Sequence, residues 1–201
     1  MLHLPFKEAL QRKGYKFFEG YLNVNVIGVR STNGRVNEFD DFLYLLFHDK
    51  RGNEIIRQYP ITTEPGLTML NAPINSKGTA ILMPDQYRSA YSIDLHAGKY
   101  EALCQRLGEV CVYRDNDKDD DIDLDQIVDC GYFGINIHKA GLDSIEVNNW
   151  SAGCQVFKRA YDFDDFMRWI KKSARIYGNA FSYTLLLDTD LYDEELIITS
   201  T

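Results

Sequence analysis

The sequence contains no long apolar run. Its 201 residues are 45% hydrophobic, but polar and charged residues interrupt the apolar stretches. A membrane-spanning helix needs about 20 consecutive apolar residues, so we expect no membrane span. The N-terminal segment MLHLPFKEALQRKG carries charges from Lys7 onward and lacks the apolar core of a secretory signal peptide. We therefore expect the chain to be made in the cytoplasm without a leader.

Basic residues are also fewer than acidic residues. The chain has 22 Lys and Arg against 30 Asp and Glu, a formal net charge of -8. Nucleic-acid binding needs a basic surface, so we expect no nucleic-acid partner. Part of the negative charge lies in one acidic run, Asp115 to Asp125. An EF-hand loop would need Gly and Glu where this run has Asp120 and Gln126. The run is interpreted as a solvated acidic loop, and calcium binding stays open.

Cysteine and histidine are few, with four of each. No two cysteines have the CxxC spacing of a thiolate zinc site, and the sequence predicts neither a metal nor a cofactor. Without a leader, reduced thiols are favoured, although the even count leaves a disulfide open. Cys104, Cys111 and Cys130 stand in apolar surroundings and are interpreted as inert core thiols.

Alternating polar and apolar residues predict a mainly β protein. Thirteen Tyr and eleven Phe favour the same class. We expect strands over residues 21–30, 41–48, 54–61, 78–84, 86–96, 110–113, 131–138, 153–157 and 180–187. Short helices are expected over 4–19, broken at Gly14, and over 99–108. The main helix is expected to begin at Asp162 and end near Gly178. No repeat or linker divides the chain, so residues 1–201 are predicted to form a single β-rich α+β domain.

The stretch from Gly134 to Phe157 carries the chemistry. His138 ends an apolar alternating run, and Cys154 follows small residues in Ser151-Ala152-Gly153-Cys154. A thiol is a nucleophile as thiolate, and a histidine can take its proton near neutral pH. The small residues allow a turn, and the backbone N–H groups of Gly153 and Cys154 are candidate oxyanion donors. His48 and His96, at strand ends, are interpreted as bystanders.

A histidine at a strand end followed by Ser-x-Gly-Cys resembles the catalytic domain of the L,D-transpeptidase (YkuD-like) family. The segments Thr63-Glu64-Pro65-Gly66 and Gly78-Thr79-Ala80 are similar to the family's turn that leads toward the active-site sheet. The resemblance covers roughly residues 54–160. It implies an L,D-transpeptidase-like β-sandwich or mixed sheet, with Cys154 as nucleophile, His138 as base, and Ser151 and Gly153 forming the turn.

The resemblance implies that the protein acts on peptidoglycan stem peptides through a thioester on Cys154. Transfer to an amine and hydrolysis are both open. Lys139 stands where the family commonly has Gly, and Ala152 where it commonly has His or Thr. Val156 stands where the family commonly has Arg or Asn. The family's substrate-positioning residue is therefore replaced, and Arg159 is one candidate to take its place. The other candidate substrate-binding residues are Gln155, Trp150, Tyr87, Arg88 and Lys139.

These departures predict a divergent member of the kind that a phage or mobile element carries. Its site of action would be the cell wall, reached by phage lysis or another route. Two alternatives stay open. The same His138 and Cys154 pair would serve a cysteine hydrolase of other specificity. A non-catalytic structural or binding module, such as part of a phage particle, would keep the fold without the activity. The oligomeric state is not predicted.

Overall fold

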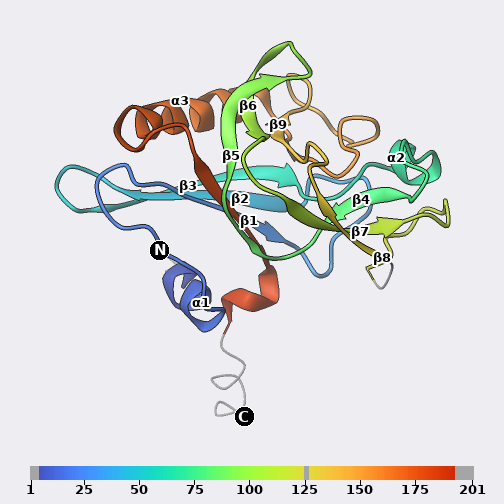
Figure 1. Cartoon of the computed structure of the whole chain (residues 1–201), viewed down its shortest axis with the longest axis horizontal. Coiled ribbons are helices and arrows are strands. Elements are labelled where there is room, and N and C mark those ends of the chain that lie inside the picture. The colour runs from blue at the N-terminus through green and yellow to red at the C-terminus, as the bar shows by residue number, and fades with distance from the viewer. Residues whose placement is uncertain (1–4, 125–126, 193–201) are drawn as a thin grey trace.

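The computed structural model describes residues 5–124 and 127–192, and a closed eight-stranded barrel dominates it (Figure 1). The order around the barrel is β1-β11-β5-β6-β9-β10-β3-β2. These strands are β1 (Asn25–Arg30), β2 (Asp41–His48), β3 (Glu54–Thr62), β5 (Gln86–His96), β6 (Tyr100–Gln105), β9 (Ile137–Lys139), β10 (Gln155–Phe157) and β11 (Phe181–Leu187).

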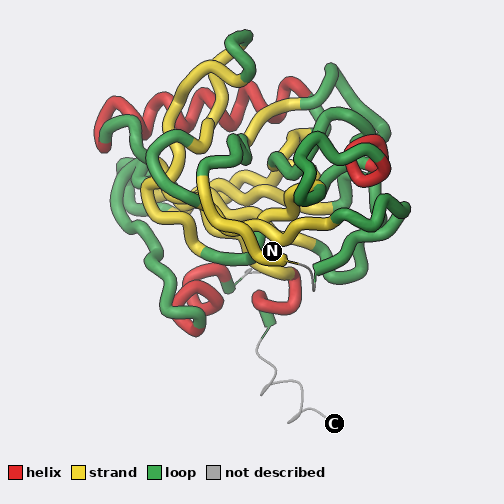
Figure 2. The backbone as a smooth tube through the Cα atoms, turned by 45° about the vertical axis from the view of Figure 1, so that its right-hand side comes forward, coloured by secondary structure: helices red, strands yellow, loops and turns green. Residues whose placement is uncertain are grey.

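A second, three-stranded sheet and three helices complete the described fold (Figure 2). The small sheet has the order β4-β7-β8, and its strands are β4 (Thr79–Leu82), β7 (Val110–Asp115) and β8 (Ile127–Gly131). The helices are α1 (Phe6–Arg12), α2 (Leu67–Asn71) and α3 (Ala160–Tyr177), followed late in the chain by the 3-10 turn η1 (Asp188–Leu191). The prediction of a mainly β protein with one main late helix is confirmed.

The main sheet closes on itself and is not a clear sandwich. Strand β1 pairs with β2 in antiparallel and with β11 in parallel orientation, so strands from the two ends of the chain lie side by side. The predicted meander of β1, β2 and β3 is confirmed, and β2 pairs with β3 along its whole length. The remaining parallel pair is β9 with β10, which follow each other in sequence. Strand β9 carries His138, and Cys154 directly precedes β10.

The core explains why α3 forms where it does. Its apolar residues recur at helical spacing, and Phe163, Phe166 and Ile170 are buried in the same cluster as the barrel interior. The Phe166 ring lies 5.1 Å from that of Phe157 in β10. Gly178, at φ 89°, ends the helix, as is common for glycine. Helix α1 packs separately, over β1, β2 and β11. Helix α3 therefore supports the strands of the candidate site.

The sequence prediction is wrong for residues 99–108, which form strand β6 instead of a helix. Ala102, Leu103 and Cys104 are buried, and β6 pairs with β5 through a turn in which Ala97 and Gly98 have positive φ. Pairing to β5 on one side and β9 on the other overrides the helical spacing of the segment. Helix α2 and strand β8 were not predicted. Of the predicted strand 131–138, only Gly131, which ends β8, and Ile137 and His138 of β9 are in regular β structure, and Gly134 at φ 71° lies in the interruption between them.

Two of the predicted core thiols form a disulfide. Cys111 of β7 faces Cys130 of β8 in the small sheet, and their sulfurs are bonded. The interpretation of both as reduced core thiols is therefore wrong. The neighbours Val110 and Val112 of β7 join the core cluster, but Cys111 is half-buried and Cys130 is exposed. Cys104 is free and buried, as expected. Cys154 is the other free cysteine of the described residues.

Candidate active site

Cys154 stands at the end of a tight turn that Ser151 closes. The Ser151 hydroxyl is buried, donates to the Cys154 carbonyl at 2.9 Å and accepts from the Gly153 N–H at 3.2 Å. Gly153 has φ 112°, which side-chain-bearing residues rarely adopt. The Gly153 N–H is thus occupied, and the expectation that it is an oxyanion donor is corrected. The Cys154 N–H has no acceptor among the described residues and is left for that role.

Both upstream segments that were expected to lead to the site contact this turn. The Gly66 N–H donates to the Ser151 carbonyl at 2.9 Å. Gly66 also lies against the Asn148 backbone so closely that a Cβ there would overlap the Asn148 carbonyl. A Cβ on Gly153 would likewise overlap the carbonyl oxygen of Ala80 in β4. Two glycines therefore allow three chain segments to meet at the cysteine.

The pairing of β9 and β10 brings His138 to the same side of the sheet as Cys154. In this parallel pair Val156 is opposite His138, and Gln155 is opposite Ile137. The Gln155 N–H donates to the Asn136 carbonyl at 2.9 Å and extends the ladder by one step. Because side chains alternate along a strand, Cys154 and Val156 share a face with His138. Cys154 and Val156 pack in one apolar cluster outside the barrel core.

The hydrogen bonds fix the form of the His138 ring. Its Nδ1 lies 3.0 Å from the Lys139 carbonyl, which only accepts, so Nδ1 carries the proton. Burial, with the neighbouring His96, lowers the pKa of His138 to about 4, so the ring is neutral at pH 7. In a neutral ring protonated at Nδ1, Nε2 has a free lone pair. His138 is therefore in the form that accepts a proton.

His96 contacts the candidate base directly. Its ring stacks on that of His138, with centroids 4.0 Å apart. The Asn136 side chain accepts from the Gln105 N–H through Oδ1 and therefore donates through Nδ2 to His96 Nδ1, at 3.1 Å. Asn136 thereby orients His96, and His96 supports the ring of the candidate base. The sequence signal for this arrangement was only the position of His96 at a strand end.

The thiol is partly buried and lies between backbone groups. Cys154 Sγ is 3.4 Å from the Asn136 N–H and 3.5 Å from the Gly134 carbonyl, and it makes no hydrogen bond to His138 among the described residues. Burial raises the pKa of the thiol to about 11. A neutral thiol and a neutral imidazole are thus the resting state at pH 7.

We expect the alkylation of Cys154 by iodoacetamide to follow this protonation state. With a pKa near 11, about one molecule in ten thousand carries the thiolate at pH 7, and the rate should rise about tenfold per pH unit from pH 7 to 10. Peptide mass spectrometry at timed intervals measures the rate at this residue alone. A rate that is fast and level between pH 6 and 9 would show a preformed thiolate and contradict this description.

Removing the second histidine is expected to raise the pKa of His138. His96→Phe keeps a stacked ring and removes the nearby charge, but burial, the larger cause, stays. The His138 pKa should therefore move upward and stay below 6.5. Loss of the Asn136 partner should cost about 1 kcal/mol of stability. Titration of the histidine C–H resonances by NMR measures the shift, with the His48 signal as internal control. An unchanged or lowered pKa would show that His96 does not act on His138.

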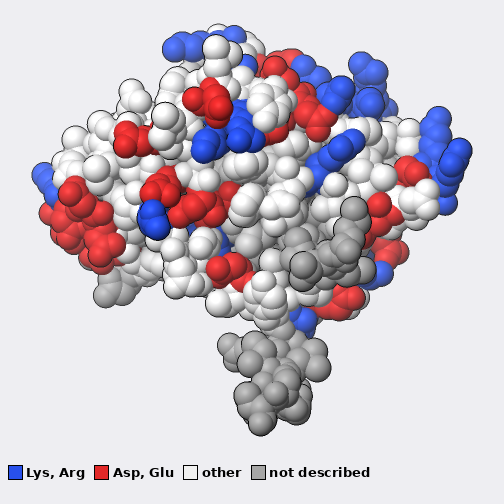
Figure 3. Space-filling model, turned by 180° about the vertical axis from the view of Figure 1, so that it is seen from behind, with Lys and Arg blue, Asp and Glu red and all other residues white. Residues whose placement is uncertain are grey.

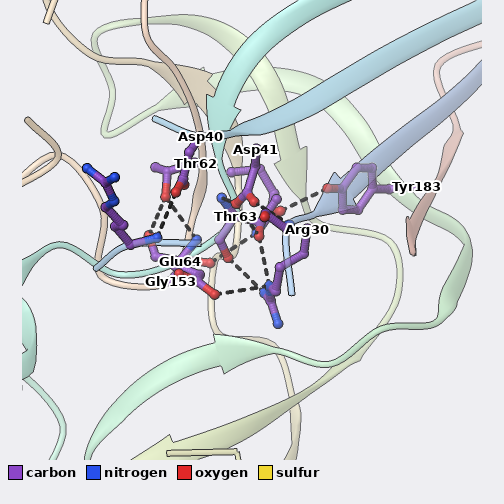
Figure 4. A network of polar contacts seen from close by, with 11 residues as sticks. Arg30, Asp40, Asp41, Thr62, Thr63, Glu64, Gly153 and Tyr183 are labelled. Atoms are coloured by element: carbon purple, nitrogen blue, oxygen red, sulfur yellow. Dashed lines mark hydrogen bonds and ion pairs between the residues drawn. The ribbon is translucent and has the colours of Figure 1, made fainter. Parts of the chain in front are cut away.

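A buried polar network holds the segment that precedes Gly66 (Figure 4). Arg30 donates to the Thr63 hydroxyl at 2.8 Å and to the Thr63 carbonyl at 2.9 Å. The Asp41 carboxylate accepts from the Thr63 N–H and hydroxyl, each at 2.7 Å. Glu64 lies 3.6 Å from Arg30, and burial raises its pKa to about 7. Sequence analysis missed Arg30 and Asp41, because charged residues in strands give no sign of burial.

Two predicted substrate-binding residues are structural. Gln155 is fully buried, and its amide donates to the Gly153 carbonyl at 3.3 Å and accepts from the Tyr183 hydroxyl at 2.8 Å. Tyr87 is buried, and its hydroxyl donates to the Met83 carbonyl at 2.6 Å. Neither side chain is available to a ligand, so both predictions are corrected. Gln155 follows Cys154 directly and points into the barrel because neighbouring residues of a strand alternate.

The other predicted contacts are spread over the surface. The Arg88 guanidinium lies 5.4 Å from the Phe18 ring, and the Lys139 ammonium lies 5.3 Å from the Tyr100 ring. The Arg159 side chain is 3.4 Å from Asp143. These contacts engage the side chains of Arg88, Lys139 and Arg159. Trp150 is 43% exposed and directly precedes Ser151 of the turn.

A cleft of about 340 Å³ borders the turn. Ile135 and Ala152 line it on the side of the cysteine, next to the Gly134 carbonyl and the Gly153 backbone that surround the sulfur. Arg114, held by Asp129 at 3.1 Å, contributes a buried guanidinium, and Tyr132 contributes an exposed ring. Arg114 and Tyr132 were not predicted from the sequence, because β7 and the segment after β8 are brought here only by the fold.

The described residues hold no group of three or more His, Cys, Asp or Glu side chains placed to bind a metal ion. Asp125 and Gln126 of the acidic run lie outside the described residues. In the described part of the chain, no helix combines the length and the apolar character that membrane crossing requires. Comparison with known protein families, curated proteins and solved structures finds no match for this chain.

Proposed function

We propose that this protein is a peptidoglycan-directed cysteine enzyme of the L,D-transpeptidase type. The observation that carries the proposal is the turn Ser151-Ala152-Gly153-Cys154, which leads directly into β10, together with a neutral His138 on β9, the parallel strand that pairs with β10. The L,D-transpeptidase-like fold is part of the proposal and rests on the same residues. The segments around Gly66 and Ala80 support it, because both pack against the turn as the resemblance implies.

The chemistry follows from the groups present. A substrate carbonyl placed next to Sγ would allow the thiol proton to pass to His138 Nε2 as the sulfur attacks the carbon. The developing oxyanion would be stabilised by the Cys154 N–H. The amine then leaves with the proton from the imidazolium, and a thioester stays on Cys154. Water or a second amine releases the acyl group, which gives hydrolysis or a cross-link.

The substrate we propose is a stem peptide, cleaved after its diaminopimelate or lysine residue. We place it in the cleft along Ile135 and Ala152, which borders the cysteine turn. The disulfide between Cys111 and Cys130 supports action outside the cytoplasm, where such bonds persist. The disulfide fits the cell wall as the site of action, reached through phage lysis or another route.

One observation favours a second candidate, a non-catalytic module that keeps the fold. The pKa of the thiol is raised to about 11, and the sulfur contacts backbone groups of Asn136 and Gly134 without a hydrogen bond to His138. A cysteine hydrolase of other specificity is the third candidate. Gln155 and Tyr87 are buried and cannot make the stem-peptide contacts predicted for them, which favours a different substrate.

Incubation with purified muropeptides tests the proposal. We expect products shortened after the third residue of the stem peptide, or dimers joined through it, identified by mass. Intact muropeptides after prolonged incubation, with both tetrapeptide and pentapeptide forms tried, would favour the non-catalytic module. Cleavage of unrelated thioester or peptide substrates alone would favour the third candidate.

Exposure to a carbapenem separates the first candidate from the third. The resemblance implies that such a β-lactam acylates Cys154, so the peptide that contains this residue should gain the mass of the drug. Cys104 is the internal control, because it is the other free cysteine of the described residues. An unmodified Cys154 in a preparation that cleaves muropeptides would count against an L,D-transpeptidase-type pocket.

A further inference from the structure

A groove of about 680 Å³ lies between α3 and the hairpin that joins β2 to β3. This volume is within the range of small-molecule sites in proteins. Its apolar lining comes from both ends of the chain and consists of Leu22, Phe47, Ile55, Trp169 and Ile176. None of the residues of the candidate active site lines it, so the groove is separate from the proposed chemistry.

The polar rim of this groove is almost entirely basic. Its cations are Lys50, Arg51, Arg57, Lys172 and Arg175, and none of them forms an ion pair within the described residues. Among the described lining residues Asp49 is the single acid, and its carboxylate is engaged by the Arg51 and Asn53 N–H groups. Lys and Arg gather along this edge of the molecule (Figure 3). An unbalanced positive rim on a chain of net charge -8 indicates an anionic ligand.

Trp169 joins the apolar floor to the basic rim. Its ring packs 4.8 Å from Phe47, while the Lys172 ammonium is 4.0 Å and the Arg57 guanidinium 5.8 Å from its centroid. Its Nε1–H is buried and has no acceptor within the described residues. A buried donor without a partner is costly, so a ligand oxygen next to the indole would be stabilising. The indole thus adds a hydrogen-bond donor to the two cations.

We propose that this groove binds an amphiphile with a single alkyl chain and an anionic head, either a carboxylate or a phosphate. The chain would cover the floor of Phe47, Ile55 and Ile176, which burial stabilises. The head would lie between Arg57 and Lys172 and accept from the Trp169 N–H. A ligand without a chain would leave the floor in water, and a neutral one would leave the cations without a counter-charge. The proposal is independent of the proposed enzyme activity.

Binding of dodecanoate and dodecyl phosphate below their micelle concentrations tests the proposal. Titration calorimetry on the full chain should give a Kd on the order of 10 μM for both anions. Dodecanol, which has the same chain without charge, should bind at least tenfold more weakly. The double variant Arg57→Met with Lys172→Met should bind both anions at least tenfold more weakly than the parent. Trp169→Phe should bind them about threefold more weakly, or more weakly still. Lys99→Met, an exposed cation outside the groove, is the matched control and should bind like the parent.

Three results would overturn the proposal. Equal affinity for dodecanol and dodecanoate would show that the cations play no part. Parent-like binding by both the double variant and Trp169→Phe would place the ligand elsewhere. Binding to phosphatidylglycerol vesicles without binding to either soluble amphiphile would identify this face as a membrane-docking surface instead of a ligand groove. Thermal melts of each variant establish that a loss of binding is not a loss of folding.

Discussion

Cys154→Ala is expected to abolish the processing of muropeptides, with a fall in rate of at least about a thousandfold. The thiol is the proposed nucleophile, and no neighbouring group replaces it: the Ser151 hydroxyl is committed to the Cys154 carbonyl. The loss should appear in the rate at saturating substrate, because the cleft along Ile135 and Ala152 is unchanged. Product masses over time measure it.

Cys104→Ala is the matched control for this prediction. Cys104 is the other free cysteine of the described residues, is buried in the barrel core, and contributes its sulfur to a contact with the Asp94 carbonyl at 3.5 Å. Its replacement should cost about 1 kcal/mol of stability and leave the rate within a factor of two. Equal rates for the parent and for Cys154→Ala would remove Cys154 from the mechanism.

Gly66→Ala is expected to destabilise the protein by about 3 kcal/mol, which corresponds to roughly 10 °C in melting temperature for a chain of this length. The backbone at Gly66 has an ordinary φ of -84°, so the effect does not come from strain in φ. It comes from the added Cβ, which would overlap the Asn148 carbonyl. Relief requires the segment to move from the Ser151 turn and to lose its hydrogen bond.

Gly34→Ala separates this effect from a general cost of replacing glycine. A Cβ at Gly34 would be 3.3 Å from the Ser31 carbonyl oxygen, a tight contact that a small shift of an exposed turn relieves. The control should change stability by less than 1 kcal/mol. Chemical denaturation of both variants gives the comparison. A Gly66→Ala protein as stable as the control would show that this segment does not pack against the turn as described.

Strong alternation predicted most of the barrel. Strands β2 and β5 have the predicted bounds, 41–48 and 86–96. In β2 an apolar run ends at a turn, and in β5 polar and apolar residues alternate. Residues 99–108 failed because their apolar residues also fit a helix, and only pairing with β5 and β9 decides between the two. The closure of the barrel through β1 and β11 joins residues far apart in sequence, which local patterns do not contain.

The candidate site was partly predictable. The order His138 then Ser151 to Cys154 named the two candidate reactive groups, and the structure pairs the strand of His138 with the strand that Cys154 directly precedes. The same alternation places Gln155 inside the barrel, so its burial was present in the pattern but not used. His96, Arg30 and Asp41 could not be found in this way. Their roles depend on which strands are neighbours and on burial at strand ends, and neither is encoded locally.

The disulfide shows a further limit of sequence reasoning. An even number of cysteines allowed a bond between Cys111 and Cys130, but the apolar residues around them favoured core thiols. The small sheet β4-β7-β8 places both residues opposite each other and outside the barrel. The pairing depends on β8, a strand that begins within an acidic, weakly patterned part of the chain and was not predicted.

The central claim is that the Cys154 sulfur carries the substrate during the reaction, and the mass of the intact protein tests it most directly. After rapid mixing with a tetrapeptide muropeptide and acid quenching, we expect a fraction of the protein to gain the mass of the acyl part of the stem peptide. Digestion should place this mass on the peptide that contains Cys154, and hydroxylamine should release it as expected for a thioester. Product formation with Cys154 unmodified at every time point, or an adduct on a different residue, would contradict the account.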